Sequence, residues 1–234
     1  MENGEQNSTY LLSWQNSGGS RTIDWKVEGV GDFDGDGYDD VFWRNSVTRR
    51  QEIWWSGLTV RPPLTAPQLG NLGSDWTYAG IGDVNGDGYA DLVTRGTPGW
   101  PTQSVVMVTL MGPNGPVSTR QWSGVGPEWV IIALGRMDSG TTRDIVFRNS
   151  NTGAVVVWYM NGLSDPSSAT VGFQDLSWSP RGARDFDGNA RSDLLWYQAS
   201  TDKLSVWLFS YSSFDSYEIG TVGMNSQLAG FLTK

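Results

Sequence analysis

The sequence contains no cysteine and no histidine. Without cysteine the protein has neither disulfide bonds nor thiolate chemistry. Without histidine it lacks the Ser-His-Asp mechanism, histidine-ligated zinc and the most common general base. An active site would need a pair of carboxylates or a set of Arg, Tyr and Lys side chains, and no acidic pair stands out from the repeat pattern described below. We therefore expect a protein that is not an enzyme.

Charged residues are scarce, at 18% of 234 residues, and their balance is acidic, with a formal net charge of −9. No stripe of Lys or Arg occurs, which disfavours nucleic acid as a partner. No apolar run approaches the roughly 20 residues that a membrane helix needs, so membrane insertion is not expected. The polar, acidic residues 1–10 do not resemble a signal peptide.

Glycine and tryptophan are abundant, with 30 and 13 residues, and four of the tryptophans mark an internal repeat. Each of these four precedes an aspartate by 15 residues and a second marker, which is Trp, Thr or Phe, by 18 residues. They start repeats that are 51, 53 and 49 residues apart: Trp25, Trp76, Trp129 and Trp178. A period of this length is typical of arrays in which each unit buries its faces against its neighbours.

The first repeat shows four short segments with strand character. Residues 25–31 are apolar, residues 40–46 alternate between apolar and polar side chains, and residues 51–57 form a third candidate strand. Residues 60–73 are rich in proline, which favours an outermost strand because proline cannot donate to a ladder. The sequence thus predicts an all-β fold, a β-propeller of about five four-stranded blades.

We expect one domain over residues 1–234, with repeats at about 25–75, 76–128, 129–177 and 178–225. Residues 226–234 resemble the start of a repeat, and residues 10–17 resemble its second strand. Residues 226–234 and 8–24 would then build a closing blade that leaves no open edge. A four-bladed ring with the ends as a patch stays open, because only 11 residues separate Trp14 from Trp25.

An aspartate-rich loop of the form D-x-D-x-D-G-x-x-D lies between the first two segments of a repeat. Oxygen ligands at positions 1, 3, 5 and 9, with the position-7 backbone carbonyl, suit calcium. Gly37 at position 6 permits the sharp bend, whereas Ala190 replaces it in the fourth repeat. The predicted ligands are Asp32, Asp34, Asp36, Tyr38 and Asp40 in the first repeat; Asp83, Asn85, Asp87, Tyr89 and Asp91 in the second; and Asp185, Asp187, Asn189, Arg191 and Asp193 in the fourth.

The clustering of carboxylates in these loops is hard to explain without a cation, because two such charges 4 Å apart repel by about 1 kcal/mol even in bulk water. We expect about three calcium ions with a structural role, which would bring the net charge from −9 to −3. Loops of this type often bind calcium too weakly to fill in resting cytosol, which favours an extracellular, secreted protein.

The third repeat departs from the loop pattern. Counting back from Asp144 places Arg136, Asp138 and Gly140 at positions 1, 3 and 5. A cation needs the first and third carboxylates of the loop, and Arg136 and Gly140 stand at their positions 1 and 5. We therefore expect no metal in this loop. We predict instead that the Arg136 guanidinium takes the place of the metal by pairing with Asp138 or Asp144.

The tryptophan spacing and the aspartate loops resemble the FG-GAP or VCBS-type repeat of integrin α-subunit propellers and of many extracellular proteins. The resemblance covers about 210 of the 234 residues. It implies calcium in the aspartate loops and a role in adhesion, in sugar binding or beside a polysaccharide-active enzyme. A stand-alone propeller is most similar to the lectin members, in which sugars bind between blades. The resemblance thus implies a calcium-stabilised lectin with several weak sites for glycans or glycoproteins.

Repeated polar residues at the end of the second segment have two interpretations. Arg44, Asn45, Arg148 and Asn149, with Arg95 at the matching place, either form a turn or bind sugar hydroxyls. Trp55 and Trp100, like Trp122, do not follow the repeat and are candidates for an exposed stacking surface.

Two other functions stay open at this stage. The first is a protein-binding adhesion module that uses the insertion at residues 97–101, and the second is a carboxylate-based polysaccharide-active enzyme. The sequence predicts neither the sugar nor the oligomeric state.

Overall fold

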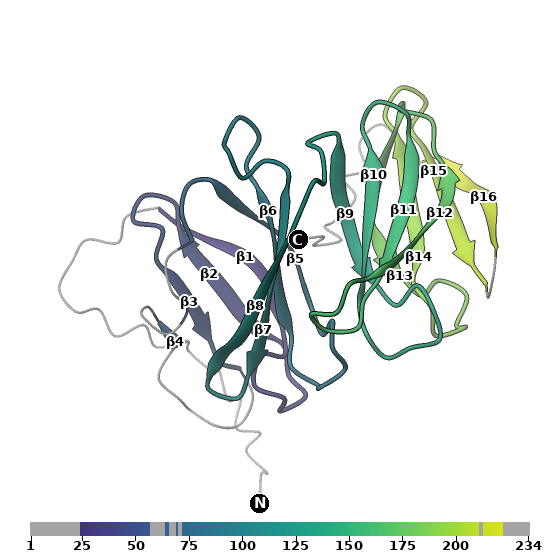
Figure 1. Ribbon diagram of the computed structural model, residues 1–234. Helices are drawn as coiled ribbons and strands as arrows, with labels where there is room; N and C mark the ends of the chain where they lie inside the picture. The colour runs from purple at the N-terminus through teal and green to yellow at the C-terminus, as the bar shows by residue number, and fades with distance from the viewer. Residues whose placement is uncertain (1–23, 57–63, 66–68, 70–71, 211–212, 222–234) are drawn as a thin grey trace, which may run out of the picture.

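The computed structural model describes residues 24–56, 64–65, 69, 72–210 and 213–221. These residues form an all-β fold of four antiparallel four-stranded sheets without any helix (Figure 1). Consistent with this, the described part contains no helix that could cross a membrane. Each sheet falls within one of the four repeats, so the repeat predicted from tryptophan spacing is the structural unit.

The strands of each sheet follow one another in space in chain order. The first sheet contains β1 (Trp25–Gly31), β2 (Asp40–Asn45), β3 (Gln51–Trp54) and β4 (Leu64–Thr65). The second contains β5 (Trp76–Gly82), β6 (Asp91–Gly96), β7 (Val105–Gly112) and β8 (Gly115–Ser123). The third contains β9 (Trp129–Gly135), β10 (Asp144–Asn149), β11 (Ala154–Tyr159) and β12 (Ser167–Phe173). The fourth contains β13 (Trp178–Arg184), β14 (Asp193–Gln198), β15 (Lys203–Phe209) and β16 (Phe214–Thr221).

The repeat markers fix where strands begin. In all four sheets the first strand starts at the repeat tryptophan and the second starts at the position-9 aspartate. The first strand also carries the same irregularity in each sheet, where one extra residue interrupts the pairing with the second strand. These bulged residues are Glu28, Ala79, Ile132 and Arg181. A bulge bends a strand and increases its twist, which suits the innermost strand of a blade.

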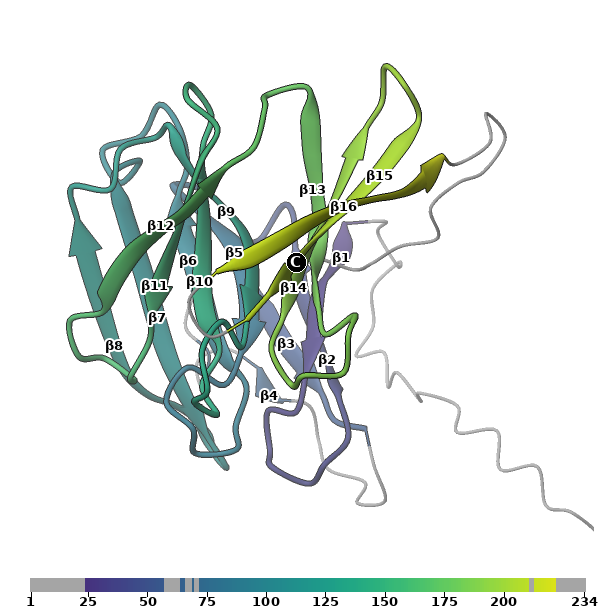
Figure 2. The same cartoon turned by 90° about the vertical axis from the view of Figure 1, so that its right-hand side faces the viewer.

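The four sheets are arranged as the blades of a propeller (Figures 1 and 2). The first strands lie side by side in the order β1, β5, β9 and β13, and the fourth strands lie on the outside. The structure therefore confirms the predicted all-β propeller and shows four of its predicted five or so blades. The predicted closing blade, built from residues 226–234 and 8–24, lies almost entirely outside the described residues.

The hydrophobic core lies between the blades. One cluster joins the first and second blades around Phe42 and Tyr78, and another joins the second and third around Val93 and Phe147. The third joins the third and fourth blades and contains the fully buried Trp196. Because each cluster draws side chains from two neighbouring sheets, a single blade would expose half of its core.

An aromatic pair inside each of three blades links the second and third strands. Trp43 and Trp54 have ring centroids 5.0 Å apart, and the equivalent pairs in the third and fourth blades are separated by 4.8 Å and 5.2 Å. The partners sit diagonally across the ladder, within reach of large side chains. In the second blade the two positions hold Thr94 and Thr109, so this pair is absent there.

Candidate metal loops and blade interfaces

The aspartate loop of the first blade closes around its position-1 side chain. The Asp32 carboxylate accepts hydrogen bonds from the backbone N–H groups of residues 35, 36 and 37, at 2.7, 3.1 and 2.8 Å. The second and fourth blades repeat this arrangement around Asp83 and Asp185. Three loops of similar sequence therefore share one backbone conformation.

The side chains at positions 3 and 5 each bind the backbone two residues further on. Asp34 accepts from the N–H of Asp36 at 3.1 Å, and Asp36 accepts from the N–H of Tyr38 at 2.9 Å. The same bonds recur in the second and fourth loops through Asn85, Asp87, Asp187 and Asn189. These bonds fix the side chains within the loop and limit the entropy lost when an ion binds.

The position-9 aspartate is fully buried in every blade and joins the loop to the third strand. Asp40 accepts from the N–H of Phe33 at 2.9 Å and from the N–H of Ser56 at 2.8 Å. The equivalent bonds of Asp91, Asp144 and Asp193 are present in the other three blades. Because Asp144 makes them in the loop that departs from the pattern, this role does not depend on the full set of metal-ligand residues.

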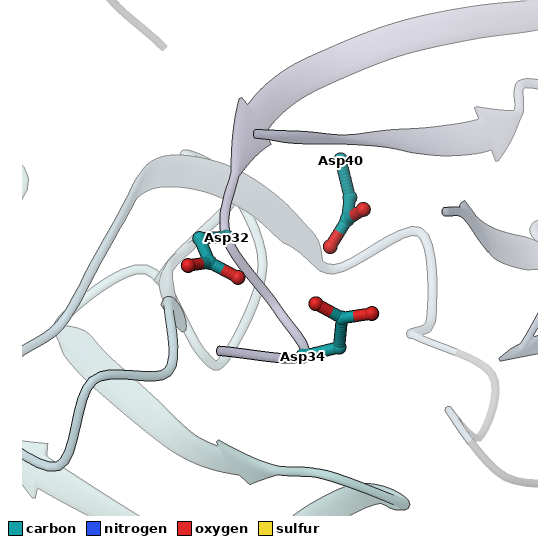
Figure 3. A group of neighbouring side chains, drawn as sticks. All are labelled: Asp32, Asp34 and Asp40. Carbon is teal, nitrogen blue, oxygen red and sulfur yellow. The ribbon is translucent and has the colours of Figure 1, made fainter. Parts of the chain in front are cut away.

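Two loops bring three carboxylates together. Oxygen atoms of Asp32, Asp34 and Asp40 lie within 4.8 Å of one another, and so do those of Asp185, Asp187 and Asp193. Figure 3 shows Asp32 and Asp34 on the loop and Asp40 opposite them, with their carboxylates facing a shared space. Such a group of hard oxygen donors fits a calcium ion, so these residues could hold one.

The second and fourth loops each contain one asparagine, which binds a neighbouring carboxylate. In the second loop Asn85 Nδ2 donates to Asp87 at 2.8 Å, and in the fourth Asn189 Nδ2 donates to Asp187 at 3.0 Å. Asn189 Nδ2 also donates to the carbonyl of Phe209 at 2.8 Å. An amide can offer its oxygen to a cation instead, so both loops keep oxygen donors at these positions.

Two position-7 side chains lean toward the preceding blade. The Tyr89 ring lies beside Gly35 of the first loop, and Arg191 Nη1 donates to the carbonyl of Met137 in the third loop at 3.4 Å. Tyr38 is 53% exposed. The predicted use of the position-7 carbonyls as ligands stays a prediction.

The buried carboxylates are held in an environment that disfavours negative charge. Burial raises the pKa of Asp40 to about 6 and that of Asp91 to about 7, and nearby loop carboxylates add to the rise. Burial likewise raises the pKa of Asp193. A divalent cation in the loop would oppose both effects by stabilising the ionised form.

The predicted ion pair of Arg136 with Asp138 or Asp144 is wrong. Among the described residues no salt bridge joins them; instead Arg136 Nε donates to the backbone carbonyl of Gly140 at 3.0 Å. Asp138 accepts from the N–H of Gly140 at 2.6 Å. The guanidinium thus connects positions 1 and 5 of the loop, but its partner is a backbone oxygen. The sequence could not reveal this, because every residue carries the same carbonyl.

Backbone hydrogen bonds join each aspartate loop to the next. The N–H at position 8 of one loop donates to the position-1 carbonyl of the preceding loop: Ala90 to Asp32 at 2.7 Å and Arg143 to Asp83 at 2.6 Å. Ser192 donates to Arg136 in the same way at 2.7 Å. The position-1 residue therefore closes its own loop with its side chain and binds the neighbouring blade with its carbonyl. The sequence does not reveal these bonds, because no side-chain type marks them.

The repeated arginines lie between blades, where they bind backbone. Arg44 is buried and donates to the carbonyls of Leu72, Gly73 and Trp76, at 3.0 to 3.2 Å. Arg95 and Arg148 bind the matching connections into the third and fourth blades. These three side chains therefore fasten the start of each following blade.

Asn45 and Asn149 form the turn that was one of their two interpretations. Each side-chain oxygen accepts from the N–H groups two and three residues further on, at 2.7 to 3.0 Å. Both asparagines are buried. Sugar binding by these asparagines or by Arg44, Arg95 and Arg148 stays a prediction.

The non-repeating tryptophans differ in exposure. Trp100 is 45% exposed in the insertion between β6 and β7. Its N–H donates to the carbonyl of Thr97 at 3.1 Å, and its carbonyl accepts from Gln103 at 3.0 Å. Trp55 is half-buried against the cluster of the first two blades. Trp122 is half-buried, and its ring lies 5.0 Å from the Arg120 guanidinium carbon.

The fold and the loops define a β-propeller whose blades carry an acidic loop between their first two strands. Residues 32–94 match the FG-GAP-like repeat family, and this stretch includes the first and second aspartate loops. The match and the blade arrangement together support an FG-GAP repeat propeller. No curated protein matches the sequence. A propeller of this family is suited to act as a protein-interaction or binding module.

Proposed function

We propose that this protein is a calcium-stabilised, non-catalytic carbohydrate-binding propeller that works outside the cell. The three-carboxylate groups of the first and fourth loops carry the calcium part of the proposal. Asp32 belongs to such a group and its carbonyl binds the next blade, so an ion there would stiffen the loop and the blade interface together. Calcium would in this way preserve the geometry of sites shared by two blades.

Trp100 supports the sugar-binding part of the proposal. An aromatic ring that is exposed and held on a short turn can stack on the apolar face of a sugar with little loss of conformational entropy. The turn is fastened by two backbone hydrogen bonds, and Trp100 is flanked by Pro98 and Pro101. The second-blade insertion is thus a better first candidate for sugar contact than the buried arginines and asparagines.

A glycan array tests the proposal. Labelled protein is applied with calcium and again with a chelator, beside Trp100→Ala and the control Phe173→Ala, which removes an aromatic ring that is 69% exposed on β12. We expect binding to a defined set of glycans that is lost in Trp100→Ala and kept in Phe173→Ala. An array without binding in the presence of calcium would contradict the proposal.

A protein-binding adhesion module is the second candidate. Exposed apolar side chains on the outermost strands favour it: Phe173 on β12, and Tyr217 and Ile219 on β16, are 69, 51 and 55% exposed. Exposed apolar side chains mark a protein-contact surface where they form one continuous patch, which this candidate requires of these three residues. In this candidate the outer strands, and not the insertion at residues 97–101 that the sequence pointed to, contact the partner. Deleting residues 97–101 should therefore abolish glycan binding and leave protein binding intact.

A further inference from the structure

Three arginines occupy repeat positions that hold other residues in the remaining blades. The residue before position 1 is glycine in the first three blades and Arg184 in the fourth. Position 1 is aspartate in three blades and Arg136 in the third. Position 8 is Asp, Ala and Ser in three blades and Arg143 in the third. The requirements of the blade fold, which the other copies meet without arginine, do not explain these side chains.

Strand pairing gathers the three arginines at one place. Gly135 pairs with Asp144, so Arg136 and Arg143 come next on opposite sides of the same hairpin. Two hydrogen bonds then tie Arg136 to Ser192 of the fourth blade: its N–H donates to Ser192 Oγ at 3.0 Å and its carbonyl accepts from the Ser192 N–H at 2.7 Å. Arg184 pairs with Asp193, which follows Ser192. Arg136 and Arg184 therefore lie where the third and fourth blades meet, and Arg143 lies beside Arg136, on the side that faces the second blade.

The three side chains line one end of a cavity of about 1000 Å³ bounded by the first strands of the blades. The stem of Arg143 packs against Gly82, where an added Cβ would lie 2.9 Å from Cγ. Within the described residues no hydrogen bond or salt bridge holds its guanidinium. Arg143 and Arg184 are exposed, and Arg136 is half-buried.

The three guanidinium groups repel one another, although four aspartates also line the cavity: Asp32, Asp39, Asp83 and Asp185. Arg143 is exposed as a whole, but the surrounding protein partly desolvates its guanidinium and lowers its pKa, and the positive charges of Arg136 and Arg184 lower it further. Asp39 and Asp83 oppose this shift, but Asp83 is engaged by the N–H groups of its own loop. Like charges held near one another disfavour their own ionised forms, so an anion bound between them would be stabilised by all three.

We propose that Arg136, Arg143 and Arg184 form an oxyanion-binding site at the aspartate-loop end of the cavity. Guanidinium groups suit carboxylate and sulfate because their N–H donors match two oxygens at once. The site takes such a group either as a small free anion or as part of an acidic saccharide. It does not require that the protein bind neutral sugars.

Isothermal titration calorimetry at constant ionic strength tests the site with three probes: sodium sulfate, glucuronate and glucose. The variants are Arg143→Gln and Arg184→Gln, and the control is Arg50→Gln, an exposed arginine in the first blade. We expect saturable binding of at least one oxyanion, weakened about tenfold or more by either site variant and unchanged in the control, because each removes a charge-assisted hydrogen bond.

The probes separate the possible outcomes. Binding of sulfate and glucuronate alike indicates a site for the anion itself, and preference for glucuronate over both other probes indicates an acidic saccharide. Equal affinity of the wild type and Arg143→Gln, or no saturable binding of either anion up to tens of millimolar, overturns the site. Circular dichroism and the unfolding temperature of each variant establish that it is folded. Glycan binding through Trp100 is unaffected by either result.

Discussion

At the scale of single residues, Ala190 shows how strictly the aspartate loop fixes its backbone. Position 6 has φ values of 88° and 91° at Gly37 and Gly88, and Ala190 adopts 66° at the same position. An alanine in this region is strained, because its Cβ approaches the backbone. The fourth loop nevertheless keeps the fold of the others and assembles three carboxylates, so the glycine is replaceable at a cost in stability.

Ala190→Gly is expected to raise the free energy of unfolding by about 1 kcal/mol, because it removes this strain. Gly88→Ala is the matched control and should lower it by a similar amount. An added Cβ at Gly88 would meet no atom within 4 Å, so only the backbone conformation changes. Urea denaturation of both variants measures the difference. Equal stabilities would show that position 6 is unstrained.

The raised pKa values of Asp40 and Asp91, about 6 and 7, predict an unusual pH dependence of calcium binding. Protons compete with the ion once these carboxylates protonate, so affinity should fall as pH drops below about 7 rather than near the usual value of about 4. Calcium titrations between pH 7.5 and 5 measure this. Affinity that stays constant down to about pH 5 would show that the two side chains remain ionised.

The calcium-free protein should show the opposite trend in stability. A buried carboxylate whose pKa is raised in the folded state favours folding below its unfolded value of about 4. This contribution is lost as pH rises through the folded value, which is about 6 for Asp144. Chelated protein should therefore be less stable at pH 7 than at pH 5 in thermal unfolding. A stability that rises over this range would mean that other groups dominate.

At the scale of strands and loops, two sets of hydrogen bonds join each blade to the next. They lie at opposite ends of its first two strands. Backbone bonds such as that from Ala90 to Asp32 join neighbouring aspartate loops. At the other end, Arg44 and its equivalents hold the connection into the next blade. The interface therefore resists both sliding and opening, which a site shared between two blades requires.

Arg148→Met tests the arginine hydrogen bonds that join neighbouring blades. The substitution keeps an apolar stem but removes bonds to the carbonyls of Gln174, Asp175 and Trp178. We expect a loss of about 3 kcal/mol in the free energy of unfolding, since the buried Arg148 side chain makes three charge-assisted hydrogen bonds that the substitution removes. Arg50→Met, at an exposed arginine, is the control and should change stability by less than about 0.5 kcal/mol. A loss no larger than the control's would show that Arg148 does not fasten the blades.

The sequence predicted elements whose cause is local. Trp25 and Asp40 mark strand starts because their spacing is set within one blade, and the loop residues bind their own backbone. The partners of Arg44 and Arg136 were not predictable, because they are backbone oxygens brought near by the packing of blades. The outward position of Trp100 follows from an insertion that breaks the repeat, and this signal was visible in the sequence.

At the scale of the whole molecule, the blades depend on one another. Core clusters cross each described interface, so the ring should unfold as a unit rather than blade by blade. Calcium in three loops would add to this coupling, because the position-1 residues lie at the blade interfaces. Several weak sugar sites on such a ring would raise apparent affinity for a multivalent surface by about 10² to 10⁴.

The most direct test of the calcium-stabilised ring is a calcium titration of chelated protein by calorimetry, followed by thermal unfolding with and without the ion. We predict saturable binding of about three ions and about 2–3 kcal/mol of added stability when calcium greatly exceeds its dissociation constant. Asp32→Asn with Asp185→Asn should remove two of the ions. Absence of calcium binding, or binding that both substitutions leave unchanged, would contradict a ring held together by its aspartate loops.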